Sequence, residues 1–147
     1  MSLRSGLAIV ATTAIAALAA MSTMTRAADM ITDPRAYCDH AVELLANGNI
    51  DELSGDLLEH SNGSTLEVEF KAAVAGFAAL PVKAGPLRLH EHASEWKAGA
   101  AFIRHYYVLI YQYTPFFLRC TMYRPDRSWL LFDFVGNADP EKIDFRQ

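Results

Sequence analysis

Near its midpoint the 147-residue chain changes abruptly from an alanine- and leucine-rich half to an aromatic and β-branched half. After Leu87, turn residues recur about every dozen positions, which is typical of successive short strands. The pattern predicts strands over residues 87–96, 102–113, 116–123 and 129–135. Because connections this short join antiparallel neighbours, the second half is expected to form a four-stranded antiparallel sheet.

The first half carries helix signals instead. Asp33 and Pro34 form an N-cap and first-turn pair, and an apolar stripe that includes Cys38 follows until Gly48. A second, shorter helix is predicted over residues 50–58. The stripe places Cys38 on the buried side of the first helix.

A third helix begins with the capping-box spacing of Ser64 and Glu67 and stops at Pro81. No internal repeat or low-complexity linker separates the two halves. Three helices followed by a meander predict an α+β fold, in which the N-terminal helices pack on one face of a curved four-stranded antiparallel sheet.

The N-terminus has the three-part pattern of a cleavable signal peptide. Arg4 is the only early charge, an uncharged apolar run extends from Leu7 to Met21, and small residues follow Arg26. The run is shorter than the ~20 residues that span a bilayer. We therefore expect residues 1–27 to be a leader and residues 28–147 to be a single domain in the periplasm or the medium, without a membrane span after cleavage.

The charge balance argues against nucleic acid as a partner. Removing the leader removes two of the 13 basic residues and none of the 17 acidic ones, so the net charge changes from −4 to −6. A negative surface without a lysine or arginine stripe repels phosphate backbones.

The two cysteines, Cys38 and Cys120, lie 82 positions apart. Metal-binding and redox motifs need closer partners, so an exported protein favours one structural disulfide, with two buried thiols as the alternative. If the bond forms and each hairpin closes symmetrically, the helix-facing side of the sheet also receives a set of candidate pocket residues. These are His105, Tyr107, Tyr111, Trp129 and Asp133. A one-residue slip in either hairpin would reverse the assignment for its strand.

The pattern resembles the nuclear transport factor 2-like superfamily in its small secreted bacterial form. The segment from Leu44 to Leu53 is similar to the break between that fold's first two helices, and the run from Trp129 to Phe134 is similar to its closing strands. The resemblance implies a cone of helices on a curved sheet. Such proteins include isomerases, cyclases and dehydratases acting on hydrophobic molecules, and many non-catalytic modules. The resemblance assigns no catalytic residue here.

Three histidines suggest a metal site. His90 and His92 lie two apart on one predicted strand, and a symmetric turn would set His105 opposite His92. Converging imidazoles can hold zinc or copper. The alternative is that these histidines are solvent-exposed strand residues, since the short-spaced ligand motifs are absent.

Asp133 interrupts an otherwise apolar strand. Facing the helices, it would have a raised pKa and could act as a general base on a lipophilic substrate, together with His105 or Tyr107. The alternation equally allows Phe132 and Phe134 to be core, with Asp133 in solvent.

The aromatic residues between Tyr106 and Tyr123 could line a cavity or simply form the core. Outward-facing rings such as Phe117 and Tyr123 could form a homodimer patch on the sheet.

These observations lead to one main hypothesis, an exported non-catalytic module that binds a small apolar ligand or a protein partner and needs no cofactor. The alternatives are a small enzyme of the same fold that moves a proton with Asp133, and a periplasmic metal-binding protein that uses His90, His92 and His105.

Overall fold

The computed structural model describes residues 30–61 and 67–145. The helices are α1 (Pro34–Ala46), α2 (Ile50–Glu59), α3 (Glu67–Ala78) and α4 (Leu80–Ala84). The strands are β1 (Leu87–Ala98), β2 (Phe102–Tyr111), β3 (Pro115–Tyr123) and β4 (Leu130–Asn137), and a 3₁₀ turn, η1 (Pro140–Ile143), follows. The predicted leader and the predicted cap at Ser64 lie outside the described residues.

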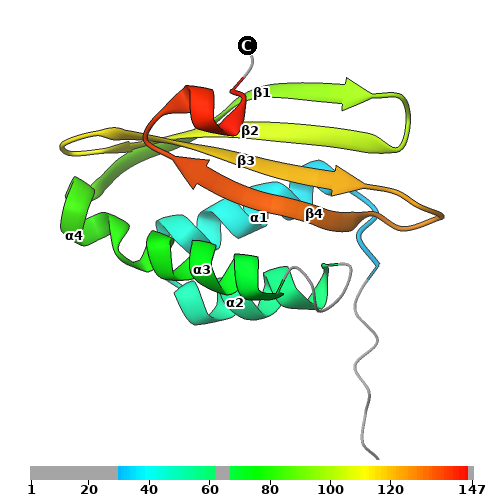
Figure 1. Ribbon diagram of the computed structural model, residues 1–147, viewed down its shortest axis with the longest axis horizontal. Helices are drawn as coiled ribbons and strands as arrows, with labels where there is room; N and C mark the ends of the chain where they lie inside the picture. The colour runs from blue at the N-terminus through cyan, green and yellow to red at the C-terminus, as the bar shows by residue number, and fades with distance from the viewer. Residues whose placement is uncertain (1–29, 62–66, 146–147) are drawn as a thin grey trace, which may run out of the picture.

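The strands form one antiparallel sheet in the order β1-β2-β3-β4. The long helices α1, α2 and α3 lie together on one face of this sheet, and η1 lies on the other (Figure 1). The predicted α+β class, with N-terminal helices on one face of a meander, is therefore confirmed. Two short elements, α4 and η1, were not predicted; each has a proline in its first turn.

A disulfide joins the helical layer to the sheet. Cys38 on α1 and Cys120 on β3 are bonded, with Cα atoms 6.0 Å apart, and neither side chain is exposed. The crosslink fixes which face of β3 meets the helices, because Leu118, Cys120 and Met122 alternate along the strand and all are fully buried. The predicted pairing of the two cysteines is confirmed.

α1 begins as its sequence predicts. The Asp33 carboxylate accepts hydrogen bonds from the backbone N–H groups of Arg35 and Ala36, and Pro34 occupies the first turn. The helix ends where Gly48 takes a positive φ of 75°, a conformation that glycine adopts without steric cost. The cap thus fixes the residue at which α1 begins. The start of α1 lies above β1 and β2, close to the candidate site residues of those strands.

Three register shifts occur among the paired strands of the sheet. In β1 the register shifts between Leu87 and Leu89 and again between His92 and Ser94, and in the β3–β4 pair it shifts between Thr121 and Met122. In the β3–β4 pair Thr121 pairs with Asp133 while Met122 pairs with Leu131, so Phe132 is the extra residue. A bulge of this kind reverses the facing of every residue beyond it.

The chain's last described residues cover part of the outer face of the sheet. Ile143 is buried there, and the Phe145 ring meets those of Tyr106 and Phe117 edge-on, with centroids 5.4 and 5.2 Å apart. Tyr106 and Thr121 are consequently fully buried although both lie on the face away from the helices. No helix within the described ranges is long and apolar enough to cross a membrane.

Candidate functional site

Side chains fill much of the space between helices and sheet. The fully buried core on this side includes residues from α1, α2, β2, β3 and β4: Cys38, Ala41, Leu53, Leu57, Leu109, Leu118, Cys120, Met122, Leu131 and Phe134. Tyr111, a predicted pocket residue, belongs to this core with 5% of its surface exposed. Recognition surfaces must therefore be sought at the edges of the helical layer.

One such surface is a cleft of about 220 Å³ between α1 and β1, which we call the Asp39 cleft. Most of its lining residues are of charged or polar type, and they come from α1, β1 and β2: Arg35, Asp39, Val42, Glu43, His90, Glu91, His92 and Tyr107.

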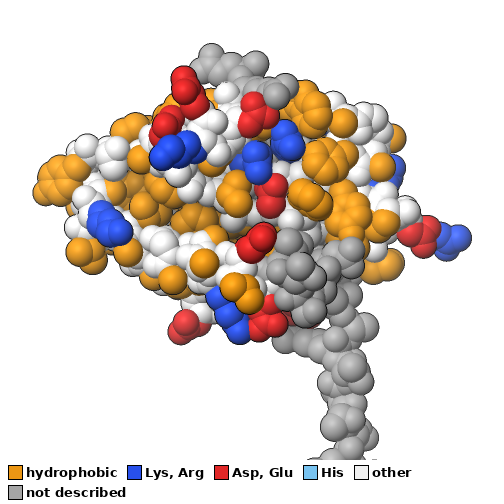
Figure 2. All heavy atoms as spheres, viewed as in Figure 1, with side chains coloured by type: hydrophobic (Ala, Val, Ile, Leu, Met, Phe, Trp, Pro, Cys, Tyr) orange, Lys and Arg blue, Asp and Glu red, His pale blue; other side chains and the backbone are white. Residues whose placement is uncertain are grey.

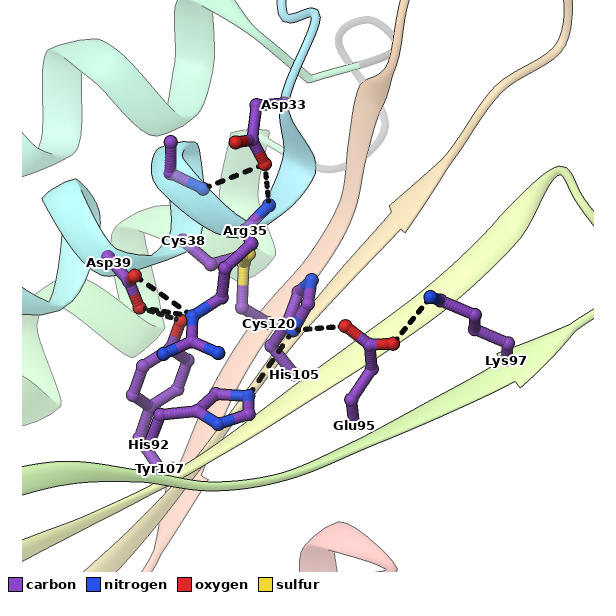
Figure 3. A network of polar contacts seen from close by, with 11 residues as sticks. Asp33, Arg35, Cys38, Asp39, His92, Glu95, Lys97, His105, Tyr107 and Cys120 are labelled. Atoms are coloured by element: carbon purple, nitrogen blue, oxygen red, sulfur yellow. Dashed lines mark hydrogen bonds and ion pairs between the residues drawn. A yellow bond between two sulfur atoms is a disulfide. The ribbon is translucent and has the colours of Figure 1, made fainter.

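Asp39 is the centre of the hydrogen bonding in this cleft. The Tyr107 hydroxyl donates to its Oδ1 at 2.6 Å, and the Arg35 Nε lies 2.8 and 2.9 Å from its two carboxylate oxygens (Figure 3). Partial burial opposes ionisation, but these two donors outweigh it and hold the pKa of Asp39 below its ordinary value. Burial, together with the bond to Asp39, raises the pKa of Tyr107.

The polar contacts continue from His92 along the sheet. His105 Nδ1 lies 3.4 Å from His92 Nε2 and 3.6 Å from the Glu95 carboxylate, which in turn accepts from Lys97 Nζ at 2.6 Å (Figure 3). His105 is fully buried under α1, and its Nε2 has no hydrogen-bond partner among the described residues.

Burial keeps both imidazoles neutral. It lowers the pKa of His105 to about 4, although the Glu95 carboxylate opposes the effect. Burial and the Arg35 charge also lower the pKa of His92. At neutral pH the network therefore has fixed protonation states, with Asp39 ionised and with His92, His105 and Tyr107 uncharged.

A second cavity, of about 260 Å³, lies at the hairpin end of the sheet, beside the start of α1. We call it the Trp129 cavity. Its walls are mainly apolar and come from α1, the β1–β2 hairpin and the residue before β4: Pro34, Lys97, Gly99, Ala100, Phe102, Ile103 and Trp129. Trp129 is held by a backbone bond from its N–H to the Ile31 carbonyl, 3.0 Å, and by the Arg124 guanidinium 5.0 Å from its ring centroid.

The structure brings some of the predicted site residues together. His105 and Tyr107 face the helices, and Trp129 lines the apolar cavity. His90 and His92 both line the Asp39 cleft. His105 does not lie opposite His92, because β1 continues to Ala98 and the hairpin closes with Ala98 opposite Phe102. His105 therefore pairs with Glu95, and beyond the shift between Ser94 and His92, His92 pairs with Tyr107.

The three histidines do not form a metal centre in the described part of the chain. Residues 30–61 and 67–145 contain no group of three His, Cys, Asp or Glu side chains placed to hold a metal ion. His92 and His105 are close, but His90 precedes the shift in β1 and pairs with Leu109 further along the sheet.

The expected inward orientation of Asp133 was wrong. Asp133 lies on the outer face, where Arg119 Nη2 donates to its carboxylate at 2.9 Å and Arg119 Nη1 donates to the Ile143 carbonyl at 3.0 Å. The bulge at Phe132 causes the reversal, since Leu131 and Phe134 both remain buried beneath the helices. Asp133 therefore cannot act as a base beside His105 or Tyr107.

Sequence reasoning missed Asp39 and Arg35. A signal was present, because the two lie four positions apart on α1, a spacing at which opposite charges pair, and Asp39 directly follows the buried Cys38. That spacing is common on solvated helix faces, so it does not by itself indicate a site.

Comparisons with known proteins identify the fold. Neither a protein-family model nor a curated protein matches the chain. Among solved structures, a putative NTF2-like transpeptidase from Campylobacter jejuni matches with a TM-score of 0.50 and 14% identity, over 68% of this chain and 97% of that one. A putative calcium/calmodulin-dependent protein kinase type II association domain from Thiobacillus denitrificans matches with a TM-score of 0.48 and 13% identity, over 73% and 95%.

The protein thus has the NTF2-like fold, in agreement with the resemblance found in its sequence. At 14% identity the likeness concerns the fold alone. Function has to be argued from the two cavities and their residues.

Proposed function

We propose that the protein is an exported, non-catalytic module that binds a small apolar ligand in the Trp129 cavity. The observation that carries the proposal is the preformed apolar lining of this cavity, to which α1, the β1–β2 hairpin and Trp129 contribute. Ligand sites are typically concave and mostly apolar, with few polar groups.

The size of the cavity limits the ligand. At about 260 Å³ it is smaller than drug-sized sites of roughly 300–1,000 Å³, so it suits one ring or a short branched chain. Lys97 is the one charged residue of the lining, and its ammonium group is already paired with Glu95. A neutral ligand is therefore favoured over an anion.

The polar network supports binding rather than catalysis. General acid–base catalysis is most efficient when the pKa of the acting group lies near the working pH. Here the pKa shifts of Asp39, His105 and Tyr107 all lead away from neutrality. Asp133, the residue expected to act as the base, lies on the outer face, where it pairs with Arg119 and lines neither cavity.

Export is supported by the disulfide together with the signal-peptide pattern of residues 1–27. Disulfides persist in oxidising compartments, and this one is fully buried between α1 and β3.

Filling the cavity tests the proposed site. Ala100→Leu adds bulk to a lining residue and is expected to reduce binding at least fivefold, because the new side chain occupies the space of the ligand. The probes are toluene and phenol, followed by saturation-transfer NMR. Wild type is expected to transfer saturation to toluene more strongly than to phenol.

The matched control is Ala101→Leu, which places the same side chain at an exposed neighbour that does not line the cavity. It should bind both probes as wild type does. An absence of transfer to either probe in wild type, or equal losses in the two variants, would contradict the proposal.

A further inference from the structure

The outer face of the sheet has two parts. η1 and Phe145 cover the part formed by Tyr106, Thr121 and Phe117. The other part lies at the end of the sheet where the β1–β2 and β3–β4 hairpins turn, and apolar side chains gather on the surface there (Figure 2).

An aromatic stripe crosses this second part, with one ring from each strand: Trp96, Phe102, Tyr123 and Phe132. The rings meet edge-to-face, with centroids 6.3 Å apart for Trp96 and Phe102, 5.9 Å for Phe102 and Phe132, and 6.0 Å for Tyr123 and Phe132. Phe132 is 47% exposed. It is the extra residue of the β4 bulge, so the irregularity that turns Asp133 outward also presents this ring to the surface.

Cations accompany the stripe. The Arg104 guanidinium lies 5.1 Å from the Trp96 ring centroid and 5.5 Å from that of Phe102. Arg124 and Arg127 lie in the connection between β3 and β4, where Arg127 and the neighbouring Asp126 are both exposed. Rings and guanidinium groups thus share one end of the molecule.

The opposite, helical side of the molecule is acidic. α2 carries Asp51, Glu52, Asp56 and Glu59 without any basic residue, and α3 carries Glu67 and Glu69 against Lys71. Since the helices lie on the far side of the sheet from the stripe (Figure 1), the charge distribution favours an orientation with the hairpin end toward an anionic surface.

The N-terminal segment joins the fold at the same end. Ile31 forms a bridge with Trp129, the residue before β4, and Met30 is 71% exposed. The exposed Met30 therefore adds an apolar side chain at the hairpin end of the domain.

We propose that the hairpin end docks peripherally on a bilayer of anionic phospholipid, with the aromatic stripe at the lipid–water boundary. Trp, Tyr and Phe prefer this boundary, and binding there combines apolar burial with attraction between Arg or Lys and anionic headgroups. A second copy of the chain fits the stripe less well. Two-fold pairing would bring the exposed Arg127 of both copies to one interface.

Vesicle sedimentation tests the proposal. The protein is recovered after export, and its N-terminus is defined by mass spectrometry, so all variants are compared in one processed form. Wild type is expected to bind vesicles of phosphatidylglycerol and phosphatidylcholine at least tenfold more tightly than pure phosphatidylcholine vesicles. Phe132→Ser and Arg127→Glu should each weaken binding roughly fivefold or more.

Two controls make the result specific. Leu89→Ser changes an apolar residue that is 54% exposed, near the other end of β1, and Lys142→Glu changes an exposed cation on η1. Both should bind as wild type does. Far-UV circular dichroism checks that each variant is folded.

Several results would overturn the proposal. Phe132→Ser and Arg127→Glu could bind anionic vesicles as well as the two controls do. Wild type could bind both vesicle types equally. Finally, Phe132→Ser could convert a dimer to a monomer in analytical ultracentrifugation without changing vesicle binding, which would assign the stripe to a second copy.

Discussion

Replacing both cysteines, as in Cys38→Ala with Cys120→Ala, is expected to lower the free energy of unfolding by about 4 kcal/mol, the largest effect we predict. The crosslink closes a loop with a sequence separation of 82, so it removes many open conformations from the unfolded chain. It also joins the first helix to a central strand. Without it, α1 is held by its apolar stripe and by the polar contacts of Asp39 and Tyr107.

Urea unfolding followed by circular dichroism measures this effect. The double variant should unfold at a much lower urea concentration than oxidised wild type. Wild type treated with dithiothreitol is the control, since it loses the crosslink but keeps the sulfur atoms; it should show most of the same loss. A double variant that unfolds at the wild-type midpoint would show that the bond contributes little.

The position of this bond was the part of the fold most readily predicted from sequence. The 3.6-residue period of the first helix places Cys38 on its buried stripe, and alternation along the third strand places Cys120 with Leu118 and Met122. Both periodicities arise because apolar side chains are buried on one side of the element. The resulting sequence patterns are strong, and they can be seen within a short stretch of the chain. The face of β3 that meets the helices follows from them.

The errors arose where the sheet departs from regular pairing. Alternation alone would set Asp133 on the same side as Leu131, but the extra residue Phe132 reverses it. The error at His105 arose at the hairpin instead, because β1 extends two residues beyond its predicted end, to Ala98, and this sets His105 opposite Glu95. A bulge depends on cross-strand packing, and no glycine at or directly beside Phe132 marks this one in the sequence.

The polar cluster could be predicted only in part. His92, His105 and Tyr107 were recognised because residue types of this kind stand out on apolar strands. Asp39 comes from α1, and its contact with Tyr107 spans 68 positions of sequence. To predict such a contact, one must know how α1 crosses the sheet. The disulfide fixes the position of α1 on the sheet but not the angle at which the helix crosses it.

The crosslink and the polar cluster depend on each other. His105 pairs with Cys120 across β2 and β3, so the imidazole lies directly beside the residue that holds α1. α1 in turn covers His105 and supplies the Asp39 and Arg35 side chains. Loss of the disulfide should therefore disturb the Asp39 cleft as well as the stability of the domain.

The burial of His105 leads to the second large effect, an acid-dependent loss of stability. Its pKa in the folded protein is lowered to about 4 from the ordinary 6.5, so between these values the unfolded chain binds a proton that the folded chain does not. Stability is therefore fully present above about pH 6.5 and falls as the pH decreases toward 4, by an amount on the order of 3 kcal/mol. His92 contributes in the same direction, because its pKa is lowered too.

The groups that face His105 set the size of this effect. Glu95 and Asp39 favour its protonation, whereas His92 and Arg35 oppose it. His105→Leu replaces the buried imidazole with an apolar side chain of similar size, and the imidazole Nε2 has no hydrogen-bond partner in the part of the chain that the structure describes. Urea unfolding at pH 7.0 and pH 5.0 should show a clearly smaller difference in this variant than in wild type. His40→Leu, at an exposed histidine of α1, should keep the wild-type difference. If His105→Leu retained the full wild-type pH dependence, the acid sensitivity would have to arise elsewhere, and the buried imidazole would not be its cause.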